Sequence, residues 1–427
     1  MIEVITIAFA LVGVVALATL VLFLFSSVGK CVENMYIKSA VASIGSKEFL
    51  THVAVTSGGE VISFDQDQCE IFTDNKQWFE RLTQDVKTAQ VYISISTYIW
   101  EEDEASVTFF KALIDAVNRG VEVRLLIDSF GSSMKKELIE RLKSSGIIVK
   151  HFRPFAFGKL SFYFSRNHRR SYIFDGTVAY IGGASVSEKW FRNHGKKFTP
   201  YEDVMYRMKG QAVFQASIAF GELWTAASGE VLQLPSSDLN TEANQLNALF
   251  LNHSPRVDVH PYTYLLWYSC MAAKEKIIIC SPYVVPGEAM AKLLIQKARS
   301  GVSIQIITQG TKEIWFVSRT GQSYYESFLE AGIQIYEYRG PAHLHTKLTV
   351  IDDLWTIIGS ANFDIRSQRI NHESVLGVSD QPFAARNSHI AAGYIENARN
   401  IELERWRRRP YSRKILEKML TSLSEQM

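Results

Sequence analysis

The sequence predicts an α/β protein with two duplicated domains, each a mixed β-sheet flanked by helices, and an N-terminal transmembrane helix. Three observations predict this fold class: an apolar run at the start of the chain, an order of strands and helices that occurs twice, and a polar motif that recurs with one spacing in both halves. The chain has 427 residues, 47% of them hydrophobic, which is enough for a large core and about two to three domains.

The first element is the apolar run Val4–Phe23, which contains no charged residue and no proline. About 20 such residues span the hydrocarbon core of a bilayer as a helix. A cleaved secretory signal would begin with a basic segment and have a shorter apolar core, so an uncleaved anchor over residues 1–30 is favoured. Lys30 and Lys38 follow the run and no basic residue precedes it, which predicts a single-pass membrane protein with its body on the cytoplasmic side.

An order of strand, helix, Gly-Val turn and strand then occurs twice. Runs rich in β-branched residues predict the strands, and amphipathic runs predict the helices. The expected elements are Val91–Trp100, Ala105–Asn118 and Arg119–Asp128 in the first copy, and Lys276–Pro286, Ala289–Arg299 and Ser300–Gln309 in the second. A third match, Ser144–Phe152 against Glu330–Tyr338, adds a strand to each copy. Self-similarity on this scale indicates a duplicated domain.

These elements place a first domain at residues 45–230 and a second at residues 251–427. The stretch between them, Ser228–Asn247, is polar and rich in Pro, Ser and Asn, so a linker is expected at residues 231–250. Because strands alternate with helices in both domains, each is expected to be a layered α/β structure.

Each domain carries one copy of a polar motif with the spacing H-x-(K/R)-x4-D-x6-G-(S/G). A single H-x-K pair is common in structural strands, whereas repetition of the whole spacing in two aligned halves indicates a functional site. The expected catalytic set is the histidine, basic residue and aspartate of each copy: His168, Arg170, Asp175, His345, Lys347 and Asp352. The expected substrate-binding set is the turn that follows: Gly182, Gly183, Ser185, Gly359, Ser360 and Asn362.

Two histidines held in one site suit phosphodiester chemistry. One imidazole attacks phosphorus and forms a phosphohistidine, while the other protonates the leaving alkoxide and then activates the incoming water or alcohol. Arg170 and Lys347 lie two positions after the histidines, on the same face of an extended segment, where they can bind the phosphate oxygens. The glycine-containing turns let backbone N–H groups approach the phosphate.

Three further features of the motifs limit this interpretation. Asp175 and Asp352 lie too far along the chain to reach the same phosphate, so spacing favours a structural role for them. His343 forms an H-x-H pair with His345, which suggests a metal site as an alternative, but no third or fourth ligand is nearby. The sequence therefore predicts no metal and no cofactor. The four cysteines, Cys31, Cys69, Cys270 and Cys280, show no ligand spacing and are expected to be isolated thiols.

The paired motif resembles that of the phospholipase D superfamily, and the sequence around it is similar to the bacterial cardiolipin synthase branch. The resemblance covers about Ala89–Val378. It rests on NHRR with its Gly-Gly turn and on four stretches: Glu202–Val213, Ser281–Met290, Ser323–Lys347 and Gly359–Ser374. The first motif departs from the second in having Arg170 in place of a lysine and Ser185 in place of an asparagine. A guanidinium keeps the charge but is longer and planar.

The resemblance implies two more site residues and a division of roles. It pairs a carboxylate downstream of each motif with the histidine of the other half, so that Asp203 orients His345 and Glu373 orients His168. It also implies that His168 is the nucleophile and His345 the general acid. Because the second motif is the better kept of the two, the sequence leaves open which histidine is phosphorylated.

The resemblance thus implies a membrane-anchored phosphatidyltransferase in a bacterial inner membrane, which makes cardiolipin or a related phospholipid from phosphatidylglycerol. Three alternatives remain: a phospholipase D hydrolase that releases phosphatidic acid, a non-catalytic lipid-binding protein, and a nuclease. The anchor and the net charge of +2 favour lipid over nucleic acid as partner. Two stretches fit a lipid surface, each with a structural alternative. The aromatic run Phe152–Phe164 is either an interfacial loop or a core strand with a turn, and the basic cluster Arg405–Lys414 either binds phosphates or is a solvated helix end.

Overall fold

The computed structural model describes residues 13, 35–38, 40–155, 164–191, 200–233, 246–256, 259–310, 315–414, 417 and 420. The predicted membrane span, Val4–Phe23, lies outside these residues except for Gly13, as does most of the aromatic run at 152–164. In the described part of the chain, no helix combines the length and the apolar character needed to cross a bilayer.

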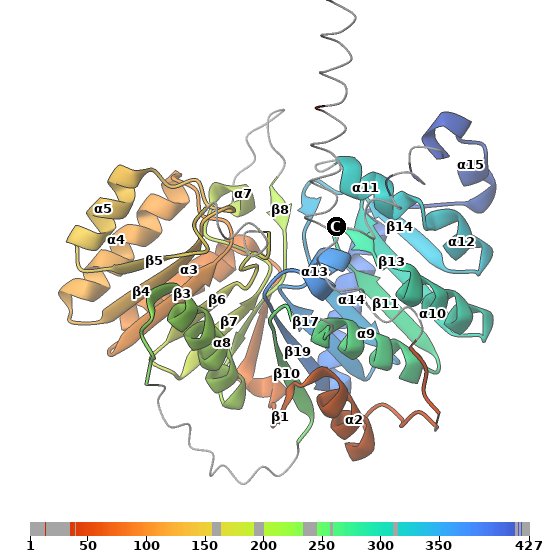
Figure 1. Ribbon diagram of the computed structural model, residues 1–427, viewed down its shortest axis with the longest axis horizontal. Helices are drawn as coiled ribbons and strands as arrows, with labels where there is room; N and C mark the ends of the chain where they lie inside the picture. Colours follow the sequence, from red (N-terminus) through yellow and green to blue (C-terminus); the bar gives the residue numbers. More distant parts are fainter. Residues whose placement is uncertain are drawn as a thin grey trace, which may run out of the picture.

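Two β-sheets lie side by side in the molecule (Figure 1). The first has the strand order β2-β9-β7-β6-β3-β4-β5 and the second the order β1-β10-β19-β17-β16-β11-β13-β14-β20. The strands of the first sheet are β2 (Cys69–Phe72), β3 (Tyr92–Thr97), β4 (Glu122–Asp128), β5 (Ile148–Phe152), β6 (Ser171–Phe174), β7 (Val178–Gly182) and β9 (Met205–Met208). Those of the second are β1 (Glu60–Ile62), β10 (Ala248–His253), β11 (Lys276–Cys280), β13 (Ser303–Gln309), β14 (Gln334–Tyr338), β16 (Leu348–Ile351), β17 (Trp355–Gly359), β19 (Glu373–Ser379) and β20 (Ala398–Asn400).

The predicted duplication and its mixed sheets are confirmed strand by strand. The series β2-β9-β7-β6-β3-β4-β5 has the same order as β10-β19-β17-β16-β11-β13-β14, and in each series the last three strands are parallel to one another and the others pair antiparallel. The predicted helices are α4 (Glu104–Asn118) and α10 (Glu288–Arg299). The predicted strand at 276–286 divides into β11 and the short β12 (Val284–Val285), with Pro282 between them.

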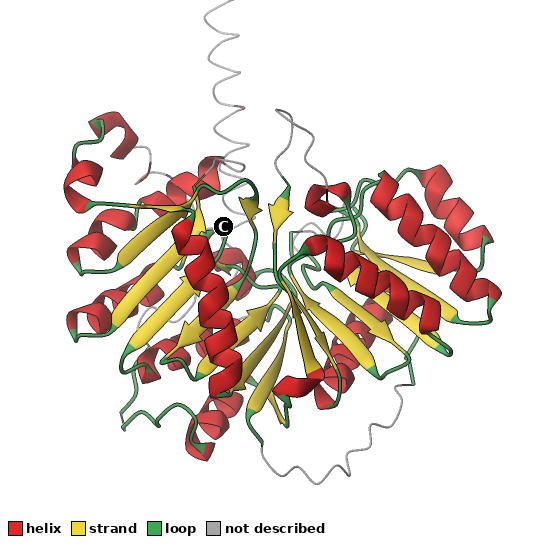
Figure 2. Ribbon diagram, turned by 180° about the vertical axis from the view of Figure 1, so that it is seen from behind, coloured by secondary structure: helices red, strands yellow, loops and turns green. Residues whose placement is uncertain are grey.

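Helices cover both outer faces and fill the space between the sheets. Helices α3 (Asn75–Thr88) and α4 pack on the outer face of the first sheet, and α9 (Pro261–Ala272) and α10 on that of the second. Helices α8 (Gln211–Ser228) and α14 (Gln381–Glu396) share one core with strands of both sheets. Seen from behind, the strands of both sheets fan out from the middle of the molecule (Figure 2). The other helices are α2 (Lys47–Ser57), α5 (Lys136–Ser144), α7 (Glu188–Phe191), α11 (Trp315–Gln322), α12 (Tyr325–Glu330), α13 (Ile365–Arg369) and α15 (Leu403–Arg407).

The expected domain boundaries need two corrections. Strand β1 pairs with β10 of the second sheet, and the Phe49 ring of α2 lies 5.1 Å from the ring of Trp355 in β17. Residues 47–62 therefore pack with the second domain, whereas the expected first domain begins at residue 45. The expected linker, 231–250, overlaps β10, which begins at Ala248 and pairs with β19. The physical reason is burial. Residues 248–250 are apolar and buried, but they follow a polar stretch, and its composition extended the predicted linker too far along the chain.

Candidate active site

Short backbone pairings between the halves bring the two motifs together. Asn167 forms a parallel bridge to His372, and His168 N donates to His372 O at 3.0 Å. In the other motif, β8 (Tyr201–Glu202) pairs with β15 (His343–Leu344), and His345 N donates to Glu202 O at 2.8 Å. In both cases the backbone partner of the motif histidine directly precedes an acidic residue of the other half.

Each motif histidine therefore meets a carboxylate from the other half. His168 Nδ1 lies 2.9 Å from Glu373 Oε1, and His345 Nδ1 lies 2.6 Å from Asp203 Oδ2. All four side chains are buried or nearly so. These are the cross-pairs that the resemblance implies. With the Nδ1 hydrogen donated to the carboxylate, Nε2 of each imidazole keeps its lone pair for chemistry.

The residue before each histidine is held by a polar side chain at the end of a parallel strand. Asp128, the last residue of β4, accepts a hydrogen bond from Asn167 N at 2.8 Å. Gln309, the last residue of β13, accepts one from Leu344 N at 2.7 Å. Neither residue is among the site residues predicted from the sequence, although their equivalent positions in the two copies are a signal of a shared role.

The two basic residues lie beside their own histidines, in the extended segments just before β6 and β16. Arg170 Nη1 is 3.2 Å from His168 Nε2, and Arg170 Nε donates to Ser185 Oγ at 3.2 Å. Lys347 Nζ lies 2.8 Å from His345 Nδ1 and 3.8 Å from Asp203 Oδ2. Ser185 therefore positions the longer guanidinium, which explains why a hydroxyl replaces an amide in the altered motif.

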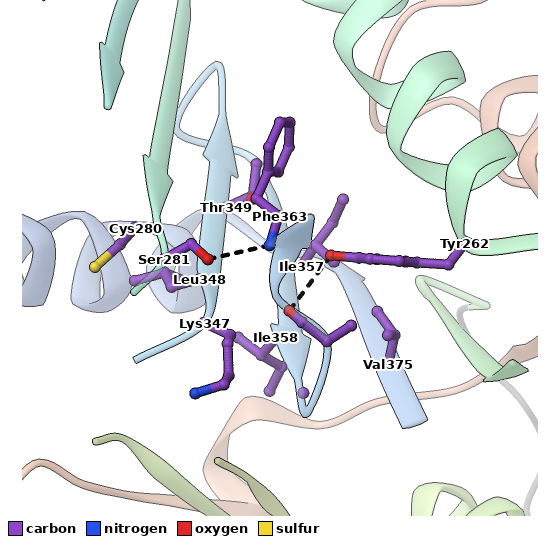
Figure 3. Close-up of a pocket in the computed structure, with 12 residues that line it drawn as sticks. Tyr262, Cys280, Ser281, Lys347, Leu348, Thr349, Ile357, Ile358, Phe363 and Val375 are labelled. Carbon is purple, nitrogen blue, oxygen red and sulfur yellow. Dashed lines mark hydrogen bonds between the residues drawn. The ribbon is translucent and has the colours of Figure 1, made fainter. Parts of the chain in front are cut away.

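The turn that follows the second motif is tied to α9 and to the residue after β11 (Figure 3). Ser281 Oγ accepts a hydrogen bond from Phe363 N at 3.0 Å, and the Tyr262 hydroxyl donates to Ala361 O at 3.5 Å. The figure shows the Lys347 side chain directed away from the Tyr262 ring. The turn is thus rigidly placed while the lysine remains on the side of the histidines.

The turn glycines are required by close packing. Gly182 and Gly359 have φ values of 154° and 147°, and a Cβ on either would overlap a backbone carbonyl of the neighbouring strand. At Gly183 a Cβ would overlap the Asp203 carboxylate and lie 2.8 Å from Lys347 Nζ. Two polar side chains of the second turn remain. Ser360 Oγ donates to Glu373 Oε2 at 2.5 Å, and Asn362 Oδ1 is buried with no hydrogen-bond partner among the described residues.

The two motif aspartates do not face the histidines, and their place in the expected catalytic set needs correction. Asp175 accepts hydrogen bonds from the backbone N–H groups of residues 90–92, and Asp352 from those of residues 274–276, all at 2.8–2.9 Å. Both lie at the far ends of β6 and β16 with φ near +50°. These contacts are structural, as the spacing indicated: each aspartate binds the backbone at the start of the neighbouring antiparallel strand, β3 or β11.

Aromatic rings enclose the histidines, and the sequence analysis missed them. The Tyr98 ring lies edge-on to His168 at 5.2 Å, and the Tyr201 ring stacks on His345 at 4.9 Å. Trp190 approaches His345 edge-on at 5.8 Å. His343, the residue behind the alternative metal interpretation, packs against Tyr201 at 5.1 Å. Within the described ranges, no three side chains of the ligating types gather as they would around a metal ion.

Burial and the surrounding cations disfavour charge on the imidazoles. The pKa of His168 is lowered by burial and by Arg170, and that of His345 lies well below its usual value because of burial, Lys347 and Arg170. Burial lowers the pKa of Lys347 to about 8 and raises that of Asp203 to about 6. Both imidazoles are thus neutral near pH 7, and a bound phosphodiester anion supplies the negative charge that favours protonation of the acid.

The ionisation of Asp203 and Lys347 predicts a bell-shaped pH dependence of kcat/KM. Activity should rise as Asp203 loses its proton near pH 6 and fall as Lys347 loses its proton near pH 8, since the reaction uses the carboxylate and the ammonium. We expect Lys347→Arg to keep the acid limb and move the alkaline limb upward, because arginine stays charged. An alkaline limb that stays in place in this variant would show that another group causes it.

Arg169 connects the first motif to the second domain and predicts a large effect on stability. Its buried guanidinium donates to Ala219 O at 2.7 Å, His253 O at 3.1 Å and Glu373 O at 3.2 Å, besides pairing with Glu222 at 3.0 Å. Removing it leaves buried carbonyls without donors, so Arg169→Ala should lower the free energy of unfolding by roughly 3 kcal/mol.

This prediction is checked by urea unfolding in neutral detergent. Lys143→Ala is the matched control, because the salt bridge between Lys143 and Glu140 is exposed and its loss should change stability by less than about 0.5 kcal/mol. Equal midpoints for the two variants would contradict the bridging role of Arg169.

Two α/β domains of one topology, with a histidine from each held by a carboxylate from the other, define the phospholipase D class of fold and site. The family described as "Cardiolipin synthase, PLD-like domain" matches residues 82–196 and 269–392. This chain belongs to that family.

Similar proteins agree with this assignment. Cardiolipin synthase A of Wigglesworthia glossinidia brevipalpis is 26% identical over 363 residues, covering 82% of this chain and 73% of that protein. A cardiolipin synthase of Oceanobacillus iheyensis is 31% identical, covering 74% of this chain and 66% of that protein. The crystal structure of phosphatidylserine synthase from Haemophilus influenzae shares the fold, with a TM-score of 0.68 at 13% identity, over 88% of this chain and 98% of that one.

Proposed function

We propose that the protein is a membrane-anchored phosphatidyltransferase that makes cardiolipin from two molecules of phosphatidylglycerol and releases glycerol. The observation that carries the proposal is the pair of cross-domain contacts, His168 with Glu373 and His345 with Asp203, each beside a buried cation. This set supplies a nucleophile, an acid–base group and two phosphate-binding cations. The relatives named cardiolipin synthase support the choice of lipid.

In the first step, His168 Nε2 attacks the phosphorus of phosphatidylglycerol. A nitrogen–phosphorus bond forms and the bond from phosphorus to the glycerol oxygen breaks. His345, which takes up a proton on Nε2 when the phosphodiester anion binds, gives that proton to the departing glycerol alkoxide. Arg170 and Lys347 bind the non-bridging oxygens as charge accumulates on them. In the second step, His345 takes the proton from a hydroxyl of the second phosphatidylglycerol, whose oxygen attacks phosphorus and releases His168.

The electrostatics of the two carboxylates support this division of roles. Burial acts to raise the pKa of Glu373, but His168 and the hydrogen bond from Ser360 outweigh it and hold the pKa low. A permanently ionised carboxylate suits the histidine that becomes cationic on phosphorylation. Asp203, with a pKa near 6 and a contact to Lys347, suits the histidine that alternately gives and takes a proton.

The test is to incubate the full chain with phosphatidylglycerol vesicles and to follow the products by mass spectrometry. We expect cardiolipin and glycerol in equal amounts, at the same rate with or without a metal chelator. Phosphatidic acid as the only product would establish the hydrolase instead. If the intact protein forms no product with phosphatidylglycerol, this lipid is not its donor and the proposal fails.

A further inference from the structure

The basic cluster Arg405–Lys414, which the reaction does not use, lines one wall of a cleft in the second domain. Figure 1 places α15, α11 and β14 on this side of the second sheet. The cleft has a volume of about 330 Å³, and we call it the arginine cleft. Six guanidinium groups line it: Arg319, Arg339, Arg399, Arg405, Arg409 and Arg413.

The charges of the arginine cleft do not cancel. Arg339 and Arg399 share Glu337, at 3.1 and 2.7 Å, and Arg319 and Arg409 share a second carboxylate behind the wall, Glu417. In the described part of the chain, Arg405 and Arg413 are exposed and form no ion pair. Even with Glu402 counted in the wall, positive charge remains in excess. A cleft with such an excess of guanidinium groups is suited to a phosphate group, which they bind by paired, charge-assisted hydrogen bonds.

Side-chain packing holds the wall of the arginine cleft together. Arg409 lies over the Trp406 ring at 3.2 Å, and the buried Trp406 packs against Tyr325 of α12 at 4.8 Å. On the outer face of this wall, outside the residues that line the cleft, Arg407 of α15 and Lys414 form surface ion pairs with acidic side chains of α12. The shared carboxylates Glu337 and Glu417 thus position four of the six guanidinium groups before any ligand arrives, whereas Arg405 and Arg413 remain available to the ligand.

The cleft opens at the same edge of the second sheet as the candidate active site. Gly310 and Arg339, which line it, directly follow the parallel strands β13 and β14. Gln309, the residue before Gly310, is the one that holds the segment before His345. In the order β16-β11-β13-β14, three strand spacings separate the catalytic strand from the cleft, or about 14 Å.

We propose that the arginine cleft is a second, non-catalytic site for a phosphate-bearing anion, and that the ligand is the headgroup of an anionic phospholipid. The shared edge means that a lipid held in the cleft and a lipid in the active site lie in one bilayer surface. The bound headgroup thereby orients the protein so that its active site faces the surface of an anionic membrane. This site is independent of the reaction assigned above, since binding needs no turnover.

The experiment counts the lipids that the full chain retains in neutral detergent, by native mass spectrometry. All proteins carry His345→Ala so that no lipid is consumed. The test variant is Arg405→Gln/Arg413→Gln, and the matched control is Arg407→Gln/Lys414→Gln, which removes the same charge from the outer face. Each is titrated with phosphatidylglycerol, with zwitterionic phosphatidylcholine and with soluble glycerol 3-phosphate.

We expect the control to retain one more phosphatidylglycerol than the test variant, whose affinity for that lipid should fall by about 30-fold, roughly fivefold per arginine. Phosphatidylcholine should show no difference. If only glycerol 3-phosphate depends on the two arginines, the cleft is a phosphate site but its ligand is soluble, which overturns the lipid assignment. Equal loss in both variants, or loss in neither, overturns the site itself. Unchanged circular dichroism spectra would show that the variants fold.

Discussion

Replacing either motif histidine by alanine is expected to lower kcat for cardiolipin formation by roughly 10⁴-fold or more. Without His168 no phosphohistidine forms, and without His345 the glycerol alkoxide has no proton donor. The carboxylates of Glu373 and Asp203, which orient the histidines, should stay in place, because the substitutions leave the backbone around them unchanged. Binding of phosphatidylglycerol should therefore change far less than turnover.

The two variants are expected to differ with an activated substrate. A phosphatidyl ester of p-nitrophenol has a leaving group that departs without a proton, so His345→Ala should release a burst of p-nitrophenol and accumulate the phosphohistidine. His168→Ala should release none. The burst is read by absorbance and the modified histidine by mass spectrometry of peptides. The reverse pattern would show that His345 is the nucleophile and His168 the acid.

The second large effect is expected at the carboxylates that cross the interface. Glu373→Gln and Asp203→Asn keep the shape of each side chain but remove the charge that holds Nδ1 protonated and supports the imidazolium. By analogy with the orienting aspartate of serine protease triads, we expect kcat to fall by about 10³- to 10⁴-fold. The KM should change little, because neither carboxylate faces the phosphate in the proposed complex.

Glu202→Gln is the matched control for this prediction. Glu202 directly precedes Asp203, but its carboxylate accepts a hydrogen bond from the Tyr338 hydroxyl at 2.5 Å and contacts neither histidine side chain in the described structure. Steady-state kinetics of the three variants give kcat and KM separately. If Glu373→Gln keeps more than about a tenth of the activity, the carboxylate does not orient His168.

Local sequence patterns predicted much of the fold because they follow local physics. Burial of one face gives a strand or helix a periodic pattern, and β3, α4, β4, β11, α10 and β13 lie where those patterns placed them. Amino-acid composition predicted the domain boundaries less well. The apolar strand β10 follows a polar stretch, and β1 pairs across the molecule, so the start of the expected first domain and the end of the expected linker were not placed correctly.

For the site, the sequence by itself determined which residues were predicted to carry the chemistry. The repeated spacing identified His168, Arg170, His345 and Lys347, and the family resemblance supplied the two carboxylates. Only the tertiary structure decided the contacts. Glu373 lies 205 residues from His168, and Asp203 lies 142 from His345, and such pairs meet only because two whole sheets pack around one shared core. No local pattern encodes a contact of that range. The arginine cleft illustrates the same limit. Its guanidinium groups come from α11, from the residue after β14, from β20 and from residues 405–413, and they gather only when those segments pack together.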